Sequence, residues 1–282
     1  MKSAISSPVN EGQDMSHIAT RTPSPLRRFW MRSQGTLLPV ITFLLVLLLW
    51  EICVKVFAIP EFLLPAPSAI WVATAEQAGL VWGHTLATLR TVVLGYGLSI
   101  LISLPLAFAL TSSRIVANAV YPLLILTQSI PKVALAPILV IALGANELPR
   151  IIITFLVAFF PLVVAVTTGL LSVPGDLIEL GRSYRATRLQ QMVQIRMPYA
   201  IPFIFSGLKT AVALAVVGAV VGEFVTSDRG LGYLIQTSTA FFRMPLAFGA
   251  MLVLSLMGIV LFQIVAVAEK LLFPWSSQQQ AD

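Results

Sequence analysis

Long apolar runs separated by short polar stretches make up this chain from about residue 37 onward. Each run has about the 20 residues that a helix needs to cross a hydrocarbon core about 30 Å thick. The runs are apolar on every side, whereas strands of an outer-membrane barrel would alternate apolar and polar residues. The pattern predicts an all-α polytopic membrane protein with six transmembrane helices, at Leu37–Ile59, Thr91–Leu110, Ala117–Leu143, Ile151–Leu171, Ile201–Val225 and Leu246–Val267.

Composition supports this prediction, because 11% of the 282 residues are charged, against about 25% in soluble domains. Residues 1–36 are polar and predict a disordered tail, followed by a membrane domain at 37–275 and a short tail at 276–282. The first apolar run begins too far from the start for a secretory signal, so we expect an uncleaved anchor.

The basic residues predict the orientation. They cluster before the first span and in the loop between the fourth and fifth spans, at Lys2, Arg21, Arg27, Arg28, Arg32, Arg182, Arg185, Arg188 and Arg196. The positive-inside rule therefore places both termini and this loop in the cytoplasm. Topology and anionic membrane lipid account for the net charge of +6, so we expect no nucleic-acid partner.

The loop at residues 172–200 has its own pattern. "LSVPG" ends the fourth span, and Asp176 with Glu179 has the spacing of a capping box. Thr187 with Gln190 repeats that spacing, which predicts two short helices joined by a turn near Arg185. Apolar residues flanked by arginines on these helices suit either docking into a groove of another protein or an amphipathic loop on lipid headgroups.

The stretch "ELGRSYRATRLQQMVQIRMP" resembles the cytoplasmic signature of binding-protein-dependent ABC importer permeases. The family's Glu-Ala-Ala start falls on Glu179, Leu180 and Gly181, and its Ile-x-Leu-Pro end on Ile195, Met197 and Pro198. The resemblance implies that the loop couples to an ATPase through Glu179, Leu180, Gly181, Arg185, Ala186, Thr187, Ile195 and Pro198. Arg185 stands where the family has glycine, so it either adopts a positive φ or alters the turn.

Three further stretches resemble the nitrate, sulfonate and taurine branch of this family: "PKVALAPILVIALG", "GEF" before "DRGLGYLI", and "AEKLLFPW". The resemblance covers Leu37–Trp275 and implies the type I importer architecture in a bacterial inner membrane. Its implied partners are a dimer of cytoplasmic ATPases, a second permease subunit expected to be another copy of this chain, and a periplasmic or extracellular solute-binding protein.

The chain lacks the residues of an enzyme. It has no Gly-x-x-x-x-Gly-Lys-Ser/Thr loop to bind nucleotide phosphates, so ATP and Mg²⁺ are expected on the partner ATPase and no cofactor on this chain. It also has no His-Glu-x-x-His, and the single Cys53 has no histidine near it in sequence. We therefore expect no catalytic and no metal-binding residues.

Polar residues inside the spans are candidates for a solute pathway. Gln128 and Lys132 bracket Pro131, which predicts an interrupted helix, and Glu223 lies near the end of the fifth span. Each has a structural alternative: Lys132 extending to the interface or pairing with an acid, and Glu223 pairing with Arg229 or a neighbouring helix. Lys209 is expected to extend to the headgroups, and "GAVVG" to allow close internal packing of helices.

These observations predict a permease subunit that forms the path for a small solute in an ATP-driven importer. Resemblance and Lys132 favour an anion such as a sulfonate, taurine or nitrate. Related branches carry pyrimidine vitamin precursors, which is the alternative within this class. A membrane scaffold or lipid-modifying protein without an ATPase partner is the alternative from another class.

Overall fold

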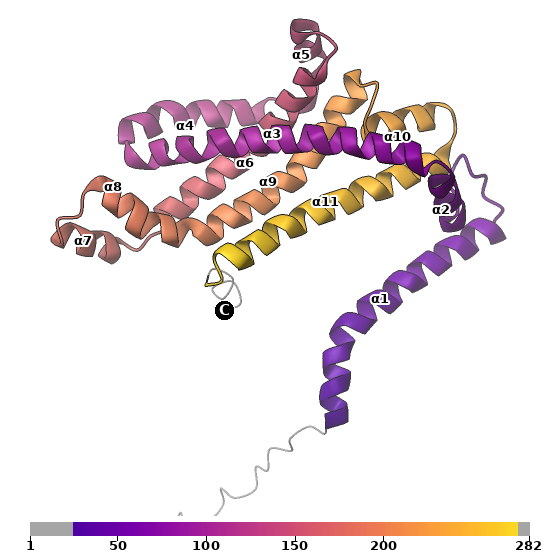
Figure 1. The fold of residues 1–282 in the computed structure, drawn as a ribbon, viewed down its shortest axis with the longest axis horizontal. Coiled ribbons are helices and arrows are strands. Elements are labelled where there is room, and N and C mark those ends of the chain that lie inside the picture. Colours follow the sequence, from indigo (N-terminus) through magenta and orange to yellow (C-terminus); the bar gives the residue numbers. More distant parts are fainter. Residues whose placement is uncertain (1–24, 276–282) are drawn as a thin grey trace, which may run out of the picture. The chain divides into compact units, whose positions relative to one another are not determined.

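The computed structural model describes residues 25–275, which form helices and contain no strand (Figure 1). The helices are α1 (Pro25–Val56), α2 (Pro67–Glu76), α3 (Ala78–Ser112), α4 (Arg114–Ser129), η1 (Lys132–Ala134), α5 (Leu135–Leu143), α6 (Glu147–Leu171), α7 (Gly175–Ser183), α8 (Arg188–Gln190), η2 (Gln191–Arg196), α9 (Met197–Thr226), α10 (Leu231–Ala240) and α11 (Met244–Leu272).

The chain divides into two units, before and after the bond between Cys53 and Val54. The described part of the first unit is a single helix, α1, which begins at Pro25 within the stretch expected as a tail. Its apolar side chains from Leu37 to Leu49 are mostly exposed, as a lipid-facing helix requires. The expected tails at residues 1–24 and 276–282 lie outside the described residues.

The spans agree with the prediction. Among the described residues, five helices are long and apolar enough to cross a membrane, and the bent pair of α4 with η1 and α5 makes six if it is one span. The all-α, multi-span membrane architecture predicted from the apolar runs is therefore confirmed.

Two spans differ in detail from the prediction. The third is bent by 75° between Ile115–Ser129 and Lys132–Leu143, because Pro131 lacks an N–H and Ile130 before it is extended, with ψ 123°. This confirms the predicted interruption. The second span begins at Ala78 instead of Thr91, since the polar side chains that made its first turns look like a loop are hydrogen-bonded inside the protein.

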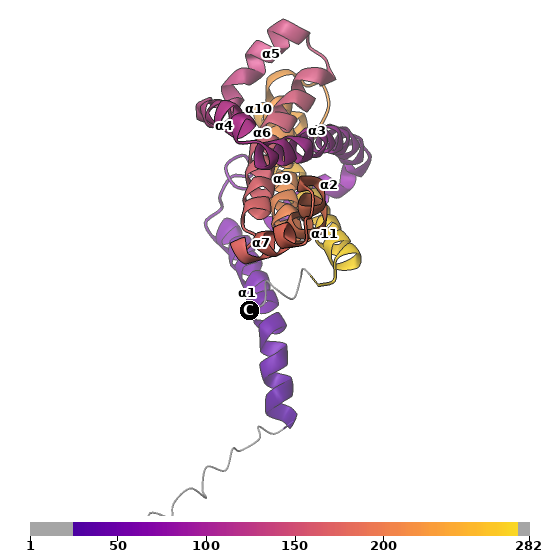
Figure 2. The same ribbon diagram turned by 90° about the vertical axis from the view of Figure 1, so that its left-hand side faces the viewer.

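Helix α6 lies between α3 and α9 and forms the centre of the second unit (Figures 1 and 2). Leu162 and Val166 of α6 are fully buried there. A Cβ on Gly218 would lie 2.9 Å from the Thr154 Cα, and one on Gly222 would lie 3.0 Å from the Arg150 Cα. The "GAVVG" segment therefore packs α9 against α6, as predicted.

The short helices lie at opposite ends of the second unit. In Figure 1, α7 and α8 lie at one end of the long helices, and α2 and α10 lie at the other. The prediction for Lys209 is wrong: it forms a buried ion pair with Glu269 of α11 instead of extending to the headgroups.

Candidate functional site

The candidate coupling loop, residues 172–200, contains two short helices joined by a turn, as the sequence predicts. Helix α7 ends at Ser183, and α8 begins at Arg188 and continues through the π-helical segment η2 into α9. The loop thus leaves α6 and returns directly into the next long helix, so its short helices are connected to both.

The turn after α7 is a Schellman motif centred on Arg185. The Ala186 N–H donates to the Gly181 carbonyl at 2.9 Å, and the Arg185 N–H donates to the Arg182 carbonyl at 2.8 Å. This pair of bonds requires a left-handed residue after the helix end, usually glycine. Arg185 is that residue, with φ 55°. Of the two predicted alternatives, Arg185 adopts the positive φ and the turn is kept.

The second helix of the loop begins with the predicted capping box. The Gln190 N–H donates to Thr187 Oγ1 at 3.3 Å, and the Thr187 N–H donates to Gln190 Oε1 at 2.8 Å. The first predicted box is wrong, because α7 begins at Gly175 with Pro174 before it and no side-chain cap. Asp176 lies inside the first turn, where its charge favours the helix N-terminus.

Contacts inside the loop bring several predicted residues together. A Cβ on Gly181 would lie 2.7 Å from Ile195 Cδ1, so α7 and η2 cross closely at this glycine. Gln191 Nε2 donates to the Ala186 carbonyl at 3.0 Å. Arg196 Nη1 donates to the Leu170 carbonyl of α6 at 3.4 Å. The loop is therefore a folded unit attached to the end of α6.

The remaining predicted residues lie on the outside of this loop. The Glu179 side chain is exposed on α7, and Pro198 is exposed in the first turn of α9. Leu180 is 54% exposed, Tyr184 81% and Leu189 73%. Large apolar side chains on a polar loop indicate a contact surface for a protein or for lipid. This surface has exposed arginines around it at positions 182, 185 and 188.

At the opposite end of the unit, three side chains bind the first N–H groups of α10. Gly230 N–H donates to His84 Nδ1 at 3.0 Å and Leu231 N–H to Thr88 Oγ1 at 2.7 Å. Gly232 N–H donates to Glu223 Oε2 at 2.8 Å. These are donors that a helix start cannot satisfy by itself.

This arrangement explains the two glycines of "RGLGY". Glu223 is fully buried, and a Cβ on Gly230 or Gly232 would collide with its carboxylate. Glu223 therefore binds backbone instead of Arg229, which lies 3.8 Å from Asp228. Sequence reasoning missed His84 and Thr88, although their spacing of four residues places both on one helix face.

Arg150 is a second charged residue that the prediction did not single out. It is 7% exposed, and its Nη1 donates to Ser227 Oγ at 2.6 Å and to the Arg229 carbonyl at 3.4 Å. The start of α6 is thus bonded to the segment between α9 and α10.

The predicted pathway residues do not form one site. Gln128 and Lys132 lie on either side of the bend in the third span, and Lys132 Nζ donates to Gln128 Oε1 at 3.1 Å. Glu223 lies in the α10 cluster instead. Within residues 25–275, no group of three or more histidine, cysteine or acidic side chains could hold a metal ion.

A family model described as "Binding-protein-dependent transport system inner membrane component" matches residues 95–278. The formylaminopyrimidine transport permease protein ThiX of Halalkalibacterium halodurans is 36% identical over 249 residues, covering 88% of this chain and 99% of ThiX. The riboflavin transport system permease protein RibX of Chloroflexus aurantiacus is 36% identical over 256 residues, covering 89% of this chain and 94% of RibX.

Two further matches are more distant in sequence. The taurine transport system permease protein TauC of Escherichia coli is 24% identical over 258 residues, covering 89% of this chain and 94% of TauC. An inward-facing structure of the MetNI methionine ABC transporter superposes with a TM-score of 0.55 at 20% identity, covering 67% of this chain and 98% of that chain.

Proposed function

This chain belongs to the family of binding-protein-dependent transport system inner membrane components, and we propose that, as a permease subunit of an ABC importer, it moves a small solute when an ATPase displaces its coupling loop. It is a multi-span membrane protein with the type I importer fold. Since the sequence contains no phosphate-binding loop, the ATP would be hydrolysed on a separate subunit.

The observation that carries this proposal is the folded turn around Arg185. A loop can transmit a displacement by the ATPase to the long helices only if it keeps its own conformation. This loop is held in its conformation by the Schellman bonds, the close contact at Gly181 and the bond from Arg196 to α6. Its exposed Tyr184 and Leu189 give it an apolar surface for a cleft on the ATPase.

The proposed assembly follows the family. Two ATPase subunits would bind the loops of two permease subunits, the second being another copy of this chain, and a solute-binding protein would deliver the solute on the opposite side. The coupling loop and both termini would face the cytoplasm, where the basic residues favour them. Glu179, Leu180, Gly181, Arg185, Ala186, Thr187, Ile195 and Pro198 would form or support the ATPase contact.

For the solute we propose a small heterocycle of the vitamin or vitamin-precursor class. The relatives named for formylaminopyrimidine and riboflavin are 36% identical, whereas the taurine permease is 24% identical. The anion expected from the sequence rested on the resemblance to the nitrate, sulfonate and taurine branch and on Lys132, whose ammonium group is hydrogen-bonded to Gln128. Gln128 and Lys132 would border the path at the bend, and Glu223 would anchor α10.

The test is reconstitution of this chain with an ABC ATPase and a solute-binding protein encoded by neighbouring genes of its source genome, which this proposal requires to exist. We expect stable copurification with the ATPase, and ATP-dependent uptake of riboflavin or an aminopyrimidine into proteoliposomes. Deletion of residues 183–190, or Glu179→Lys, should abolish both without loss of membrane insertion. Survival of copurification and uptake in both variants would refute the coupling role, and lack of any ATPase partner would favour a scaffold.

A further inference from the structure

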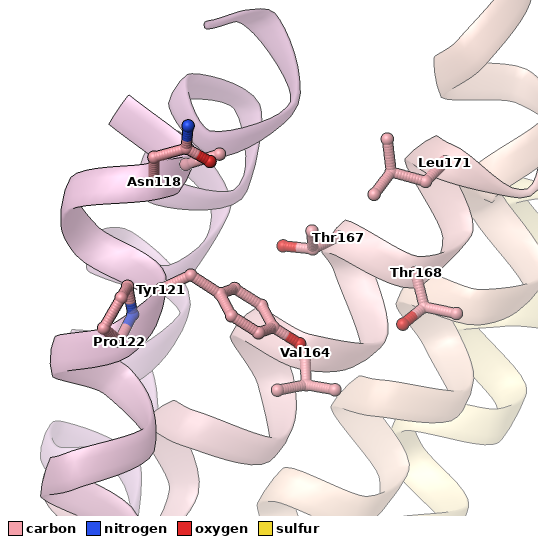
Figure 3. A pocket seen from close by; sticks show the side chains of 8 residues that line it. Asn118, Tyr121, Pro122, Val164, Thr167, Thr168 and Leu171 are labelled. Carbon is pink, nitrogen blue, oxygen red and sulfur yellow. The ribbon is translucent and has the colours of Figure 1, made fainter. Parts of the chain in front are cut away.

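A pocket of about 460 Å³ opens between α4 and the last turns of α6 (Figure 3). Its volume falls in the range of about 300–1,000 Å³ that small-molecule sites occupy. Asn118, Tyr121 and Pro122 line it from α4, and Thr167, Thr168 and Leu171 from α6. The pocket therefore lies at the same end of α6 as the coupling loop, which begins at the next residue.

Thr167 has an unsatisfied hydroxyl at this pocket. Several threonines of the long helices donate to the carbonyl four residues earlier, as Thr111 does to Ala107 at 2.9 Å and Thr210 to Ser206 at 3.0 Å. Thr167 is 7% exposed, and among the described residues its Oγ1 has no hydrogen-bond partner. Figure 3 shows this hydroxyl pointing away from α6 toward α4. A buried polar group without a partner is costly, so a ligand that bonds to it gains free energy.

The opposite wall offers complementary groups. Pro122 has no N–H, so the Asn118 carbonyl loses the donor that a regular helix would supply four residues later. The Asn118 side-chain amide adds both a donor and an acceptor. The Tyr121 ring extends from α4 toward Val164 and Thr168 in Figure 3, which gives the pocket an aromatic surface.

We propose that this pocket binds the transported solute as it leaves the permease for the cytoplasm, and that the solute is an uncharged planar heterocycle with amino or carbonyl substituents. Among the residues whose side chains the structure describes, no Arg, Lys, Asp or Glu lines the pocket, so a permanently charged anion would there lose its hydration without gaining a counter-charge. A neutral ring would stack on Tyr121 and exchange hydrogen bonds with Thr167 and Asn118. This inference rests on the proposed function and assigns a solute site within the permease.

The pocket is also connected to the coupling loop. Arg196 donates to the Leu170 carbonyl, and the next residue, Leu171, lines the pocket. A displacement of the loop by the ATPase would therefore move this wall relative to α4. Such a movement would change the width of the pocket and break its contacts with the solute, which favours release of the solute.

The experiment measures binding and uptake separately. Riboflavin, an aminopyrimidine and taurine are titrated against the detergent-purified permease–ATPase complex, and their ATP-dependent uptake is measured with the solute-binding protein present. Thr167→Val and Asn118→Leu should weaken heterocycle binding roughly three- to tenfold, the effect of one lost hydrogen bond. Thr210→Val makes the same chemical change at a hydroxyl bonded to its own helix and should leave binding unchanged. Thr167→Val should not lower the thermal midpoint of the unliganded complex, because that hydroxyl has no partner to lose.

The outcomes separate the inference from the proposed function. If heterocycles are taken up but bind Thr167→Val, Asn118→Leu and the parent complex equally, the pocket assignment is overturned and the importer function stands. If taurine alone is taken up, the neutral solute class is overturned. If no solute is taken up although the complex assembles and hydrolyses ATP, the proposed transport function fails, and the pocket assignment fails with it.

Discussion

Lys209 of α9 and Glu269 of α11 form an ion pair inside the bundle, with Nζ 2.9 Å from Oε2. Their side chains are 17% and 5% exposed, so neither charge is well hydrated. A buried pair contributes little compared with an apolar pair of the same shape, but losing one partner leaves a charge buried alone. The pair therefore makes the packing of α11 on α9 depend on both residues.

We predict that Glu269→Leu lowers the stability of the purified chain by about 3 kcal/mol, because it leaves the Lys209 ammonium without this counter-charge. The double variant Lys209→Met with Glu269→Leu should recover more than half of that loss. Thermal unfolding in detergent measures both.

The exposed pair of Arg90 and Glu147 is the control for this prediction. These side chains are 67% and 46% exposed at an N–O distance of 3.2 Å. Glu147→Gln should cost less than about 1 kcal/mol, since water screens such pairs. If Glu269→Leu and Glu147→Gln lowered the free energy of unfolding equally, burial of the Lys209–Glu269 pair would not determine the cost of losing one partner.

Arg185→Gly should stabilise the coupling loop by about 1 kcal/mol, because glycine adopts the φ of 55° without the Cβ clash that arginine bears. Hydrogen exchange of residues 175–196 measures this, and copurification with the ATPase shows whether the arginine side chain also contacts the partner.

Arg182→Gly is the matched change three residues earlier, inside α7. Arg182 lies in the last turn of that helix, where the same substitution should destabilise the loop by up to about 1 kcal/mol, since glycine is a poorer helix former than arginine. Faster exchange in Arg185→Gly than in the parent chain would mean that the arginine side chain holds the turn together.

The sequence predicted those features that follow from local patterns. Apolar runs of sufficient length located the spans, Pro131 located the bend, and the Thr187 and Gln190 spacing located the start of α8. Each depends on residues within one continuous stretch of the chain. Arg185 was the hardest local feature, and its conformation needed the bonds of the Schellman turn to be decided.

Features that depend on distant residues were not predictable in this way. Thr88 accepts a hydrogen bond from the Leu231 N–H, 143 residues away in sequence, and Lys209 pairs with Glu269, 60 residues away. Neither pair therefore leaves a local pattern in the sequence. The pocket likewise needs Pro122 of α4 and Thr167 of α6 to face each other. A single sequence records the polarity of such residues but not which helix supplies the partner.

Thr88→Val should loosen α10, because the buried Leu231 N–H would lose its acceptor while the side-chain volume stays the same. An unsatisfied buried donor costs about 1–3 kcal/mol. Hydrogen exchange at residues 231–240 should therefore speed up by at least about fivefold, the factor that corresponds to 1 kcal/mol.

Thr91→Val tests whether this effect is specific. Thr91 is also buried on α3, and its hydroxyl, like that of Thr88, donates to the carbonyl four residues earlier, so the bond from the Leu231 N–H is what distinguishes Thr88. We expect unchanged exchange of α10 in this variant. If Thr91→Val and Thr88→Val accelerate exchange alike, the acceleration reflects general loosening of α3 and not the loss of the acceptor.

Gly218→Ala should destabilise the packing of α9 on α6. The added methyl group would lie 2.9 Å from the Thr154 Cα, and a backbone atom cannot rotate away as a side chain can. Overpacking of this kind costs about 1–3 kcal/mol.

Gly97→Ala on α3 is the control, because a Cβ there would have no atom within 4 Å. It should instead stabilise its helix by about 0.5–1 kcal/mol. Opposite shifts of the thermal midpoint in detergent would therefore separate the packing requirement at Gly218 from helix propensity, and two shifts of the same sign would contradict the close contact of α6 and α9.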